Sequence, residues 1–302
     1  MSSKGTLLLS RRDLISAAAT AGILSTGFAT IGKAAAADNQ SDSVSGLVSV
    51  FNLGSVTLHS YMAPGSSSVV TTQIVETPNE LHIIDTQFIQ SIAKETRDYA
   101  DTLGKPVAGI YLSHWHPDHV LGAAQYEGLP FFTTADIRAD CDNYKTTFEK
   151  RKSQFGDSTP LILPEGSLKT GEHDWDGVRV VINQINDCEA EHALTFYFPD
   201  AGLMIVQDLM FNNVHAFPLG NHSNWIDTLK NIREEQGVRI IGCGHGLPAT
   251  VGAVTDSIAY LEFQKAVFSE EQDADSAITA LKSHYPKFEG NSVLRFVSGV
   301  YQ

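Results

Sequence analysis

Three histidines and one aspartate lie within a run of six residues, His114-Trp115-His116-Pro117-Asp118-His119. The run directly follows an apolar stretch, residues 107–113, which reads as a buried strand. Imidazole nitrogens and carboxylate oxygens are donors that a divalent ion such as Zn²⁺ takes in proteins. A loop that opens at the end of a strand can direct alternate side chains to two neighbouring ions. The run therefore predicts a metal site that contains His114, His116, Asp118 and His119.

Further acids and histidines recur downstream, each beside a segment that reads as a strand. Asp208 comes just after the apolar segment 203–206, and His245 lies in a Gly-His-Gly triplet after the apolar segment 238–241. The segment 187–194 carries two more candidates, Glu189 and His192. Such a spaced set of donors is a stronger signal for one metal site than the six-residue run alone.

The elements that must position these residues can be placed from hydrophobic periodicity and turn residues. Short strands are expected at 56–61, 69–75, 81–84, 107–113, 178–185, 194–198, 203–206 and 238–241. Helices are expected at 88–103, 120–126, 225–235, 255–268 and 275–284, with a charged helical segment at 135–152. Strands come first, and then strands and helices alternate without a linker or a repeat. This order predicts one α/β domain, in which the last two helices serve packing only.

The amino-terminal residues read as an export signal rather than as part of that domain. Arg11, Arg12 and Asp13 precede nineteen uncharged residues, 14–32, which are rich in alanine, glycine, serine and threonine. Small residues at 34–37 then precede the polar Asp38. The paired arginines resemble a bacterial twin-arginine signal, and the uncharged segment is weakly apolar for a membrane anchor. We therefore expect residues 1–37 to be removed on export to the periplasm, which leaves 38–302 as the mature domain.

Charge and cysteine content exclude several classes of partner. The 302-residue chain has a formal net charge of −14, and removal of residues 1–37 makes it more acidic. So acidic a surface disfavours nucleic acid and stable association with anionic lipid. The three cysteines, Cys141, Cys188 and Cys243, are too few for a disulfide framework and read as buried side chains. The expected partner is a small-molecule substrate, and the oligomeric state stays open.

The run from His114 to His119, followed by Val-Leu-Gly, resembles the His-x-His-x-Asp-His signature of the metallo-β-lactamase superfamily. Asp85, after the expected strand 81–84, is similar to an early structural aspartate of that family. Asp208 is similar to its bridging carboxylate, and His245 to its last ligand. The four motifs come in the family's order and cover nearly all of the mature chain. The resemblance implies an αββα sandwich that holds two divalent ions, expected to be Zn²⁺.

The third ligand of the first ion is where this chain departs from the family. There the ligand is usually a histidine nineteen residues before the bridging aspartate, and the same count back from Asp208 reaches Glu189. His192 has the usual side chain but comes three positions later, where the strand 194–198 is about to begin. Strand register decides which side chain can reach the site, so Glu189 is expected and His192 is the alternative. The implied ligands are His114, His116 and Glu189 for the first ion, Asp118, His119 and His245 for the second, and Asp208 as the bridge.

A glutamate at this position resembles one branch of the superfamily, the secreted alkylsulfatases. The strand Thr-Phe-Tyr-Phe-Pro at 195–199 and the triplet Asn-Val-His at 213–215 are similar to segments of those enzymes. The chain departs from them at Asp208, where they have a glutamate, and at the carboxyl terminus, where they carry large further domains. The resemblance implies hydrolysis of an ester-like bond by a metal-bound hydroxide, with a sulfate ester, a lactone and a carboxylic ester all open as substrates.

Two residues have expected catalytic roles in this interpretation. Asp118 would act at the second ion, and His215 could protonate a leaving group, although a packed histidine fits the pattern equally well. Asp85 is expected to support a histidine ligand rather than to react. Two alternatives are a mononuclear iron oxygenase acting on persulfides, which shares this fold, and a degenerate metal-binding protein without catalysis. The intact second ligand set argues against the oxygenase, and competent donors at every ligand position argue against the degenerate protein.

Overall fold

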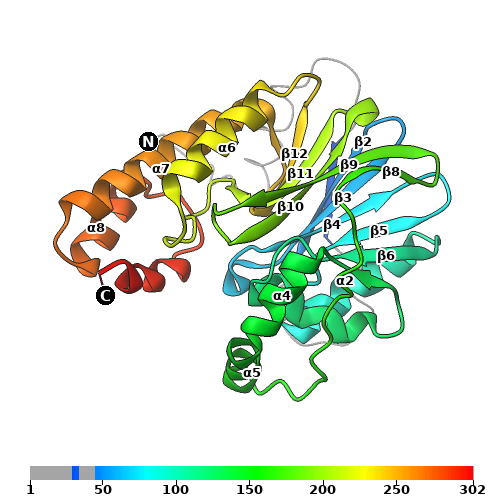
Figure 1. Cartoon of the computed structure of the whole chain (residues 1–302), viewed down its shortest axis with the longest axis horizontal. Helices are drawn as coiled ribbons and strands as arrows, with labels where there is room; N and C mark the ends of the chain where they lie inside the picture. Colours follow the sequence, from blue (N-terminus) through cyan, green and yellow to red (C-terminus); the bar gives the residue numbers. More distant parts are fainter. Residues whose placement is uncertain (1–28, 34–44, 302) are drawn as a thin grey trace, which may run out of the picture.

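Two β-sheets pack face to face in the computed structural model of the chain, and helices lie on the outer side of each (Figure 1). The structure describes residues 29–33 and 45–301. One sheet has seven strands in the order β1-β2-β3-β4-β5-β6-β7, and the other has six in the order β13-β12-β11-β10-β9-β8. This αββα arrangement confirms the fold class that the sequence predicts.

The seven-stranded sheet consists of β1 (Ala29–Lys33), β2 (Leu47–Asn52), β3 (Thr57–Met62), β4 (Thr71–Glu76), β5 (Leu81–Ile84), β6 (Val107–Tyr111) and β7 (Phe131–Phe132). The six-stranded sheet consists of β8 (Gly171–Trp175), β9 (Val178–Asn186), β10 (His192–Phe198), β11 (Leu203–Phe211), β12 (Ile240–His245) and β13 (Ala249–Thr250). The α-helices are α2 (Gln90–Thr102), α3 (Pro117–Val120), α4 (Ala135–Asn143), α5 (Lys145–Gln154), α6 (His222–Glu234), α7 (Val254–Glu270) and α8 (Ala274–His284). Short 3₁₀ helices are η1 (Gly65–Ser67), η2 (Leu121–Tyr126), η3 (Pro199–Ala201), η4 (Val251–Ala253) and η5 (Val293–Tyr301).

Most neighbouring strands in the described residues are antiparallel, and three pairs are parallel: β5 with β6, β6 with β7, and β11 with β12. Most of the candidate ligands lie in or just after strands of two of these pairs. Because parallel strands end at the same edge of a sheet, the segments that follow them lie side by side. Asp85 follows β5 and the histidine loop follows β6, while Asp208 lies in β11 and His245 ends β12.

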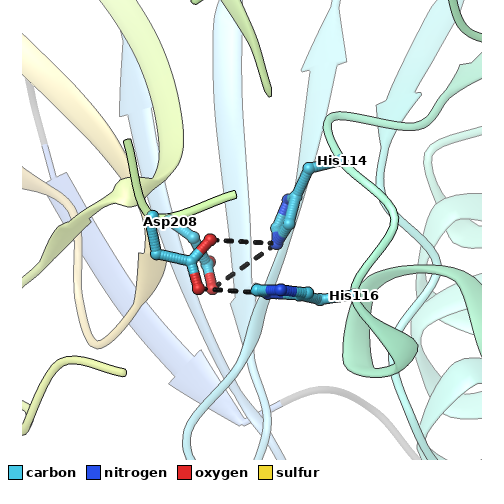
Figure 2. A group of neighbouring side chains, drawn as sticks. His114, His116 and Asp208 are labelled. Carbon is cyan, nitrogen blue, oxygen red and sulfur yellow. Dashed lines mark ion pairs between the residues drawn. The ribbon is translucent and has the colours of Figure 1, made fainter. Parts of the chain in front are cut away.

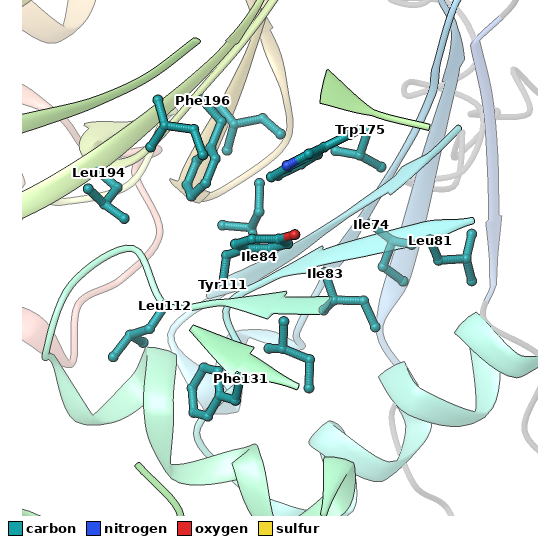
Figure 3. Packing of buried hydrophobic residues seen from close by; sticks show 14 of the residues in the cluster. Ile74, Leu81, Ile83, Ile84, Tyr111, Leu112, Phe131, Trp175, Leu194 and Phe196 are labelled. Carbon is teal, nitrogen blue, oxygen red and sulfur yellow. The ribbon is translucent and has the colours of Figure 1, made fainter. Parts of the chain in front are cut away.

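An apolar core holds the two sheets together. Tyr111 of β6 stacks on Trp175 of β8, with ring centroids 4.5 Å apart, and meets Phe196 of β10 at 6.0 Å (Figure 3). All four residues of β5 are buried, because the sheet is covered on both of its faces. Burial of each such aromatic or branched side chain stabilises the fold by about 1.5–3 kcal/mol. The core therefore holds the two sheets firmly together, and with them the edge at which the candidate ligands lie.

A second apolar cluster joins the six-stranded sheet to α6 and α7. Trp225 of α6 is buried within it, and its Nε1 donates to the backbone carbonyl of Leu209 on β11 at 2.8 Å. This bond attaches the helix to the strand that carries Asp208.

The charged segment 135–152 differs from the single helical segment that the sequence predicts. It forms two helices, α4 and α5, which meet at Tyr144. Tyr144 leaves the helical backbone because its ring stacks on Trp115, with centroids 3.6 Å apart, and its hydroxyl donates to Glu191 at 2.6 Å. The strand predicted at 203–206 is also longer, because residues 207–211 are buried and β11 continues beside β12. β8 is not predicted because most of its residues are polar and exposed.

The expected export signal, residues 1–37, lies largely outside the described residues. Within it, Ala29–Lys33 form β1, which pairs antiparallel with β2. Cleavage after Ala37 would therefore leave β2 as the edge strand of its sheet. Among the described residues, no helix has both the length and the apolar character that crossing a membrane requires.

Candidate metal centre

The seven candidate ligands come from both sheets and meet at one edge of the sandwich. They are His114 and His116 in the loop after β6, Asp118 and His119 in α3, Glu189 in the loop before β10, Asp208 in β11 and His245 at the end of β12. Pro117 is the first residue of α3, where its missing N–H removes no helical bond. It turns the chain directly from the histidine loop into the helix, so that ligands on both sides of it face the same site.

A first group of ligand atoms comes from His114, His116, Glu189 and Asp208, all of them buried and all within 4.8 Å of one another. Nδ1 of His116 lies 3.0 Å from Oε1 of Glu189. Nε2 of His114 lies 3.8 Å from Oε2 of Glu189 and 3.7 Å from Oδ2 of Asp208. Figure 2 shows the two imidazole rings pointing toward the carboxylates. These donors enclose a space where one cation can be held by nitrogen and oxygen atoms.

A second group comes from Asp118, His119 and His245. Oδ2 of Asp118 lies 3.4 Å from Nε2 of His245 and 3.9 Å from Nε2 of His119. Asp208 faces this group as well, because its Oδ1 is 3.1 Å from Nε2 of His119 and its Oδ2 is 3.3 Å from Nε2 of His245. The Asp208 carboxylate therefore lies between the two groups.

Several polar atoms of the two groups are buried and make no well-aligned hydrogen bond among the described residues, although two of the oxygens lie 3.0–3.1 Å from ring nitrogens. They are Nε2 of His114, Nε2 of His119, Oε1 of Glu189 and Oδ1 of Asp208. A buried polar atom without a partner costs about 1–3 kcal/mol, so four such atoms facing one space call for a bound group. Imidazole and carboxylate donors at this point fit a divalent cation.

A second layer of hydrogen bonds fixes the histidine rings. Nδ1 of His119 donates to Oδ2 of Asp85 at 2.8 Å, and Nδ1 of His245 donates to a backbone carbonyl at 2.9 Å. The hydroxyl of Ser113 donates to Asp85 at 2.7 Å and accepts from Nδ1 of His114 at 2.9 Å. With a proton on each Nδ1, the three Nε2 atoms are left as lone-pair donors toward the cluster, which is the form that binds a metal.

Two residues beside the cluster have a left-handed backbone, which is uncommon outside glycine. Asp85 has a φ of 64° and Gln207 has a φ of 43°. The side chains meet, because Nε2 of Gln207 donates to Oδ2 of Asp85 at 2.5 Å. The register of β11 against β12 also shifts at Gln207, so the strand bends just before Asp208. Such local strain is kept where the surrounding structure holds a functional geometry.

The charges of the cluster call for cations. Burial opposes ionisation of Asp208, but the histidines around it outweigh burial and lower the pKa of its carboxyl well below the usual value. Burial also opposes protonation of His245, but the Asp208 and Asp118 carboxylates raise its pKa to about 10. Burial raises the pKa of Glu189 above its usual value. Without a metal ion, the carboxylates are therefore balanced by protons on His119 and His245, whose pKa values the carboxylates raise.

The cluster forms one wall of a cavity of about 740 Å³, a size typical of small-molecule sites. Five candidate ligands line it: His116, Asp118, Glu189, Asp208 and His245. Much of the remaining wall is apolar, from Phe88, Trp115, Tyr144, Phe211, Phe217, Leu219, Val293 and Phe296. The cavity can therefore take a small molecule with an apolar part against the cluster.

The structure brings Glu189, but not His192, to the other first-group residues. His192 points instead to α4, where its Nδ1 lies 2.7 Å from Oδ2 of Asp140. His192 belongs to none of the metal-competent groups among the described residues. The difference follows from register, because His192 is already the first residue of β10 and pairs with Asn186.

His215 is not brought to the cluster. It is buried, its Nδ1 lies 3.1 Å from the hydroxyl of Tyr260, and its ring contacts Tyr260 and Phe288. It does not line the cavity. Because of this packing, His215 cannot reach a leaving group in the cavity. Its position matches the second interpretation from the sequence, a histidine packed in the interior. Trp115 and Pro117, the two variable positions of the histidine loop, both line the cavity.

Three cavity residues carry no sequence signal of function. Arg151 lies in α5, and Arg295 and Phe296 lie in η5, at the end of the chain. They fall in a charged helix and in a carboxyl-terminal segment without a motif, so neither spacing nor residue type indicates them. From the sequence, only a packing role is expected for the last two helices. The segment after them, η5, contributes residues to the cavity wall.

Comparison with known proteins bears on the fold. No protein-family model matches the sequence, and a comparison with curated proteins finds no significant match. Among solved structures, a metallo-β-lactamase from Pontibacter korlensis superposes with a TM-score of 0.53 at 15% identity, covering 71% of this chain and 99% of the other. A double mutant of the sec-alkyl sulfatase PisA1 superposes with a TM-score of 0.57 at 15% identity, covering 80% of this chain.

The chain spans about half of the alkyl sulfatase, 48% of its length. At 15% identity both likenesses support only the fold described above. The evidence for the candidate metal centre is the geometry of its own residues. The chain has the metallo-β-lactamase fold.

Proposed function

We propose that this chain is an exported metallohydrolase that holds two divalent ions, expected to be Zn²⁺, and cleaves an ester-like bond in a small molecule. The observation that carries the proposal is the position of Asp208. Its carboxylate lies within 3.7 Å of nitrogen donors of both groups, His114 on one side and His119 and His245 on the other. A carboxylate between two sets of donors suits a pair of ions that act together.

The residues divide between two positions. His114, His116 and Glu189 would hold one ion, Asp118, His119 and His245 would hold the other, and Asp208 would contact both. Nitrogen and carboxylate oxygen donors without a cysteine among them suit Zn²⁺ and similar divalent ions. Bound there, such ions would lower the pKa of water toward neutrality and polarise the scissile bond.

The remaining chemistry falls to residues of the chain. Asp118 is the most open of the ligands, with 27% of its side chain exposed, and it lines the cavity. Its carboxylate can orient the attacking water and accept a proton from it at the side where the substrate enters. Asp85 holds His119 and Ser113 in place, and through Ser113 it also orients His114. The apolar wall keeps bulk water from the bond to be broken.

A sulfate ester, a lactone or a carboxylic ester would each fit this chemistry. The alkyl sulfatase with the same fold acts, by its name, on an alkyl sulfate, which gives that class a modest preference. A mononuclear oxygenase would leave the donors Asp118, His119 and His245 without a role, and no observation favours it.

Hydrolysis can be tested with a panel of 4-nitrophenyl esters, 4-nitrophenyl sulfate, secondary alkyl sulfates and lactones. The metal-loaded protein should cleave at least one class, EDTA should abolish the activity, and added Zn²⁺ should restore it. Asp118→Asn should lower kcat about a hundredfold or more while the fold is kept, since a general base contributes that much. A metal-loaded protein that cleaves none of these classes would contradict the proposal.

Export is the second part of the proposal, and it places the mature protein in the periplasm. It rests on Arg11, Arg12 and the uncharged segment 14–32, which lie outside the described residues except for residues 29–32. Arg11→Lys with Arg12→Lys should leave the protein in the cytoplasm with residues 1–37 uncleaved. Cell fractionation and amino-terminal sequencing would show this, and unchanged export of the double variant would argue against a twin-arginine route.

A further inference from the structure

Two arginines from distant parts of the chain meet at one aromatic ring in the cavity. The guanidinium carbon of Arg151, on α5, lies 5.5 Å from the centroid of Phe296, and that of Arg295, on η5, lies 4.8 Å from it. All three residues line the cavity that the ligand cluster closes at its other side. Two cations are thus held on the same ring beside the site.

In the part of the chain that the structure describes, these two arginines differ from most of the others in having no directly paired carboxylate. Four arginines each have a carboxylate oxygen within 4.0 Å: Arg97, Arg138, Arg179 and Arg233. Within residues 45–301, Arg151 and Arg295 have no carboxylate oxygen so close, although acids outnumber basic residues 35 to 21 in the chain. Arg151 donates instead to the side-chain oxygen of Gln154 at 3.0 Å. Neither positive charge is therefore paired directly with a carboxylate of residues 45–301.

The positive charges of Arg151 and Arg295 repel each other when no anion lies between them. Burial lowers the pKa of Arg151, the Arg295 guanidinium lowers it further, and Asp118 in the ligand cluster acts in the opposite direction. A cation on an aromatic ring gains about 0.5–1 kcal/mol at an exposed site, which only partly offsets the repulsion between like charges. An anion between the two guanidiniums would relieve this repulsion.

The carboxylates elsewhere in the cavity are already occupied by donors. Glu191 accepts from Nε1 of Trp115 at 2.7 Å and from the hydroxyl of Tyr144 at 2.6 Å. Asp187 accepts from Nδ2 of Asn221 at 2.7 Å. The Glu191 contacts also hold Trp115 and Tyr144 nearly parallel, at 6° and a centroid separation of 3.6 Å. The stack presents a flat, rigid apolar surface in the same cavity as the two arginines.

The composition of the candidate ligand set explains why an anionic substrate would need these arginines. Three of the candidate ligands are carboxylates, Asp118, Glu189 and Asp208, so their charges offset most of the charge of two divalent ions. A metal centre of this composition attracts an anion weakly. In an acidic protein, the attraction for an anionic substrate must then come from elsewhere in the cavity, and Arg151 and Arg295 are placed to supply it.

We propose that Arg151 and Arg295 form a subsite for an oxyanion of the substrate, a carboxylate or a sulfonate-like group, while the apolar body of the substrate packs on the stack of Trp115 and Tyr144. This inference rests on the proposed function for the identity of the site, and it defines the substrate class as amphiphilic anions. Arg151 and Arg295 are specificity-determining residues that bind the substrate away from the reacting bond. Guanidinium groups suit this role because they bind oxyanions through paired N–H donors.

Binding can be measured without turnover by calorimetry on the metal-loaded full chain. The probes are octane-1-sulfonate and octanoate as amphiphilic anions, with 1-octanol as the neutral counterpart. Arg151→Gln and Arg295→Gln should each weaken binding of the two anions about tenfold, which corresponds to about 1.4 kcal/mol per charged hydrogen-bonded contact. Binding of 1-octanol should not change. Arg295→Lys, which keeps the charge, should retain part of the affinity for the anions.

Arg179→Gln is the matched control, because Arg179 lies on β9 outside the cavity lining and is paired with Glu172 at 2.7 Å. It should leave all three affinities unchanged. Equal anion binding in the wild type and in the Arg151→Gln, Arg295→Gln double variant would overturn the subsite. So would absence of anion binding to the wild type, or an equal loss for 1-octanol.

Turnover separates this inference from the proposed function. The mono-4-nitrophenyl ester of adipic acid and 4-nitrophenyl hexanoate differ at the end remote from the ester, where one has a carboxylate and the other a methyl group. The double variant should raise KM for the adipate about a hundredfold and leave that for the hexanoate unchanged. If the protein hydrolyses both esters and the double variant changes KM for neither, the subsite is contradicted but the hydrolase is not. Arginine-dependent binding of the sulfonate by a protein that cleaves no ester or sulfate contradicts the hydrolase alone.

Discussion

Gly244 of β12 lies directly against Asp208 of β11. A methyl group on Gly244 would overlap Oδ1 of Asp208 and would lie 2.7 Å from its backbone nitrogen. This close approach of two parallel strands is what allows the Asp208 carboxylate to lie between the two ligand groups. The glycine is therefore needed for space at the metal centre.

Gly244→Ala should displace Asp208 and lower both metal content and hydrolysis, with a loss of about 1–3 kcal/mol in the free energy of unfolding from overpacking. Gly252→Ala in η4 is the control, because the nearest heavy atom to a methyl group there is 3.7 Å away. Metal content per chain and urea unfolding would be measured on both variants. Wild-type metal content in Gly244→Ala would show that the position of Asp208 is not critical.

The third ligand of the first ion can be tested by a pair of substitutions. Glu189→Ala should weaken metal binding at the first position by more than the 10–100-fold typical of an outer-layer change, because it removes a direct donor. His192→Ala should have little effect, since that imidazole contacts Asp140 on α4. Zinc titration of both variants would decide. The assignment would be reversed if His192→Ala lost the metal and Glu189→Ala kept it.

Asp85 would act on a bound metal through other residues, so its removal should change metal affinity without removing a ligand. Asp85→Asn keeps the size of the side chain but cannot accept from His119, Ser113 and Gln207 as the carboxylate does. We expect metal affinity to fall 10–100-fold, by about the amount seen for such outer partners. Asp98→Asn, at an exposed pair with Lys94, serves as control. Equal affinity in the two variants would contradict a positioning role for Asp85.

Buried His82 predicts how stability depends on pH. Its ring stacks on Trp175 with centroids 4.2 Å apart, and burial lowers its pKa from 6.5 to about 4, against a smaller opposing effect of Asp176. Between these two pKa values the unfolded chain binds a proton that the folded chain does not. The free energy of unfolding should therefore fall as the pH is lowered through this window, by at most about 3 kcal/mol from this residue.

His82→Phe keeps an aromatic ring against Trp175 and removes the titration. Its free energy of unfolding should thus decrease less than that of the wild type between about pH 7 and pH 4.5. Chelator should be present throughout, so that loss of metal does not contribute. His173→Phe, in the exposed part of β8, is the control and should follow the wild type. A wild-type pH dependence in His82→Phe would contradict the argument.

The candidate donors could be placed near one another from the sequence because apolar runs and turn residues mark the strands beside them, although Asp208 lies within β11 rather than after it. Even the choice of Glu189 over His192 could be argued, since it depends on register along β10. The role of Tyr144 could not, because its departure from the helix depends on contacts with Trp115 and Glu191 that the chain makes across long separations. The meeting of Arg151 with Arg295 and Phe296 could not be predicted for the same reason, since Arg151 is far from the other two in the sequence. His215, for which a packed position fits the sequence equally well, contacts Tyr260 and Phe288, which are distant from it in the chain.

The central claim, that two ions share Asp208, is tested most directly by metal content. Elemental mass spectrometry on the purified protein should find about two equivalents of zinc or a similar divalent ion per chain. Asp208→Ala should lose most of this metal and all hydrolysis, since that carboxylate faces both donor groups. One equivalent in the wild type, or full metal content and activity in Asp208→Ala, would contradict the account.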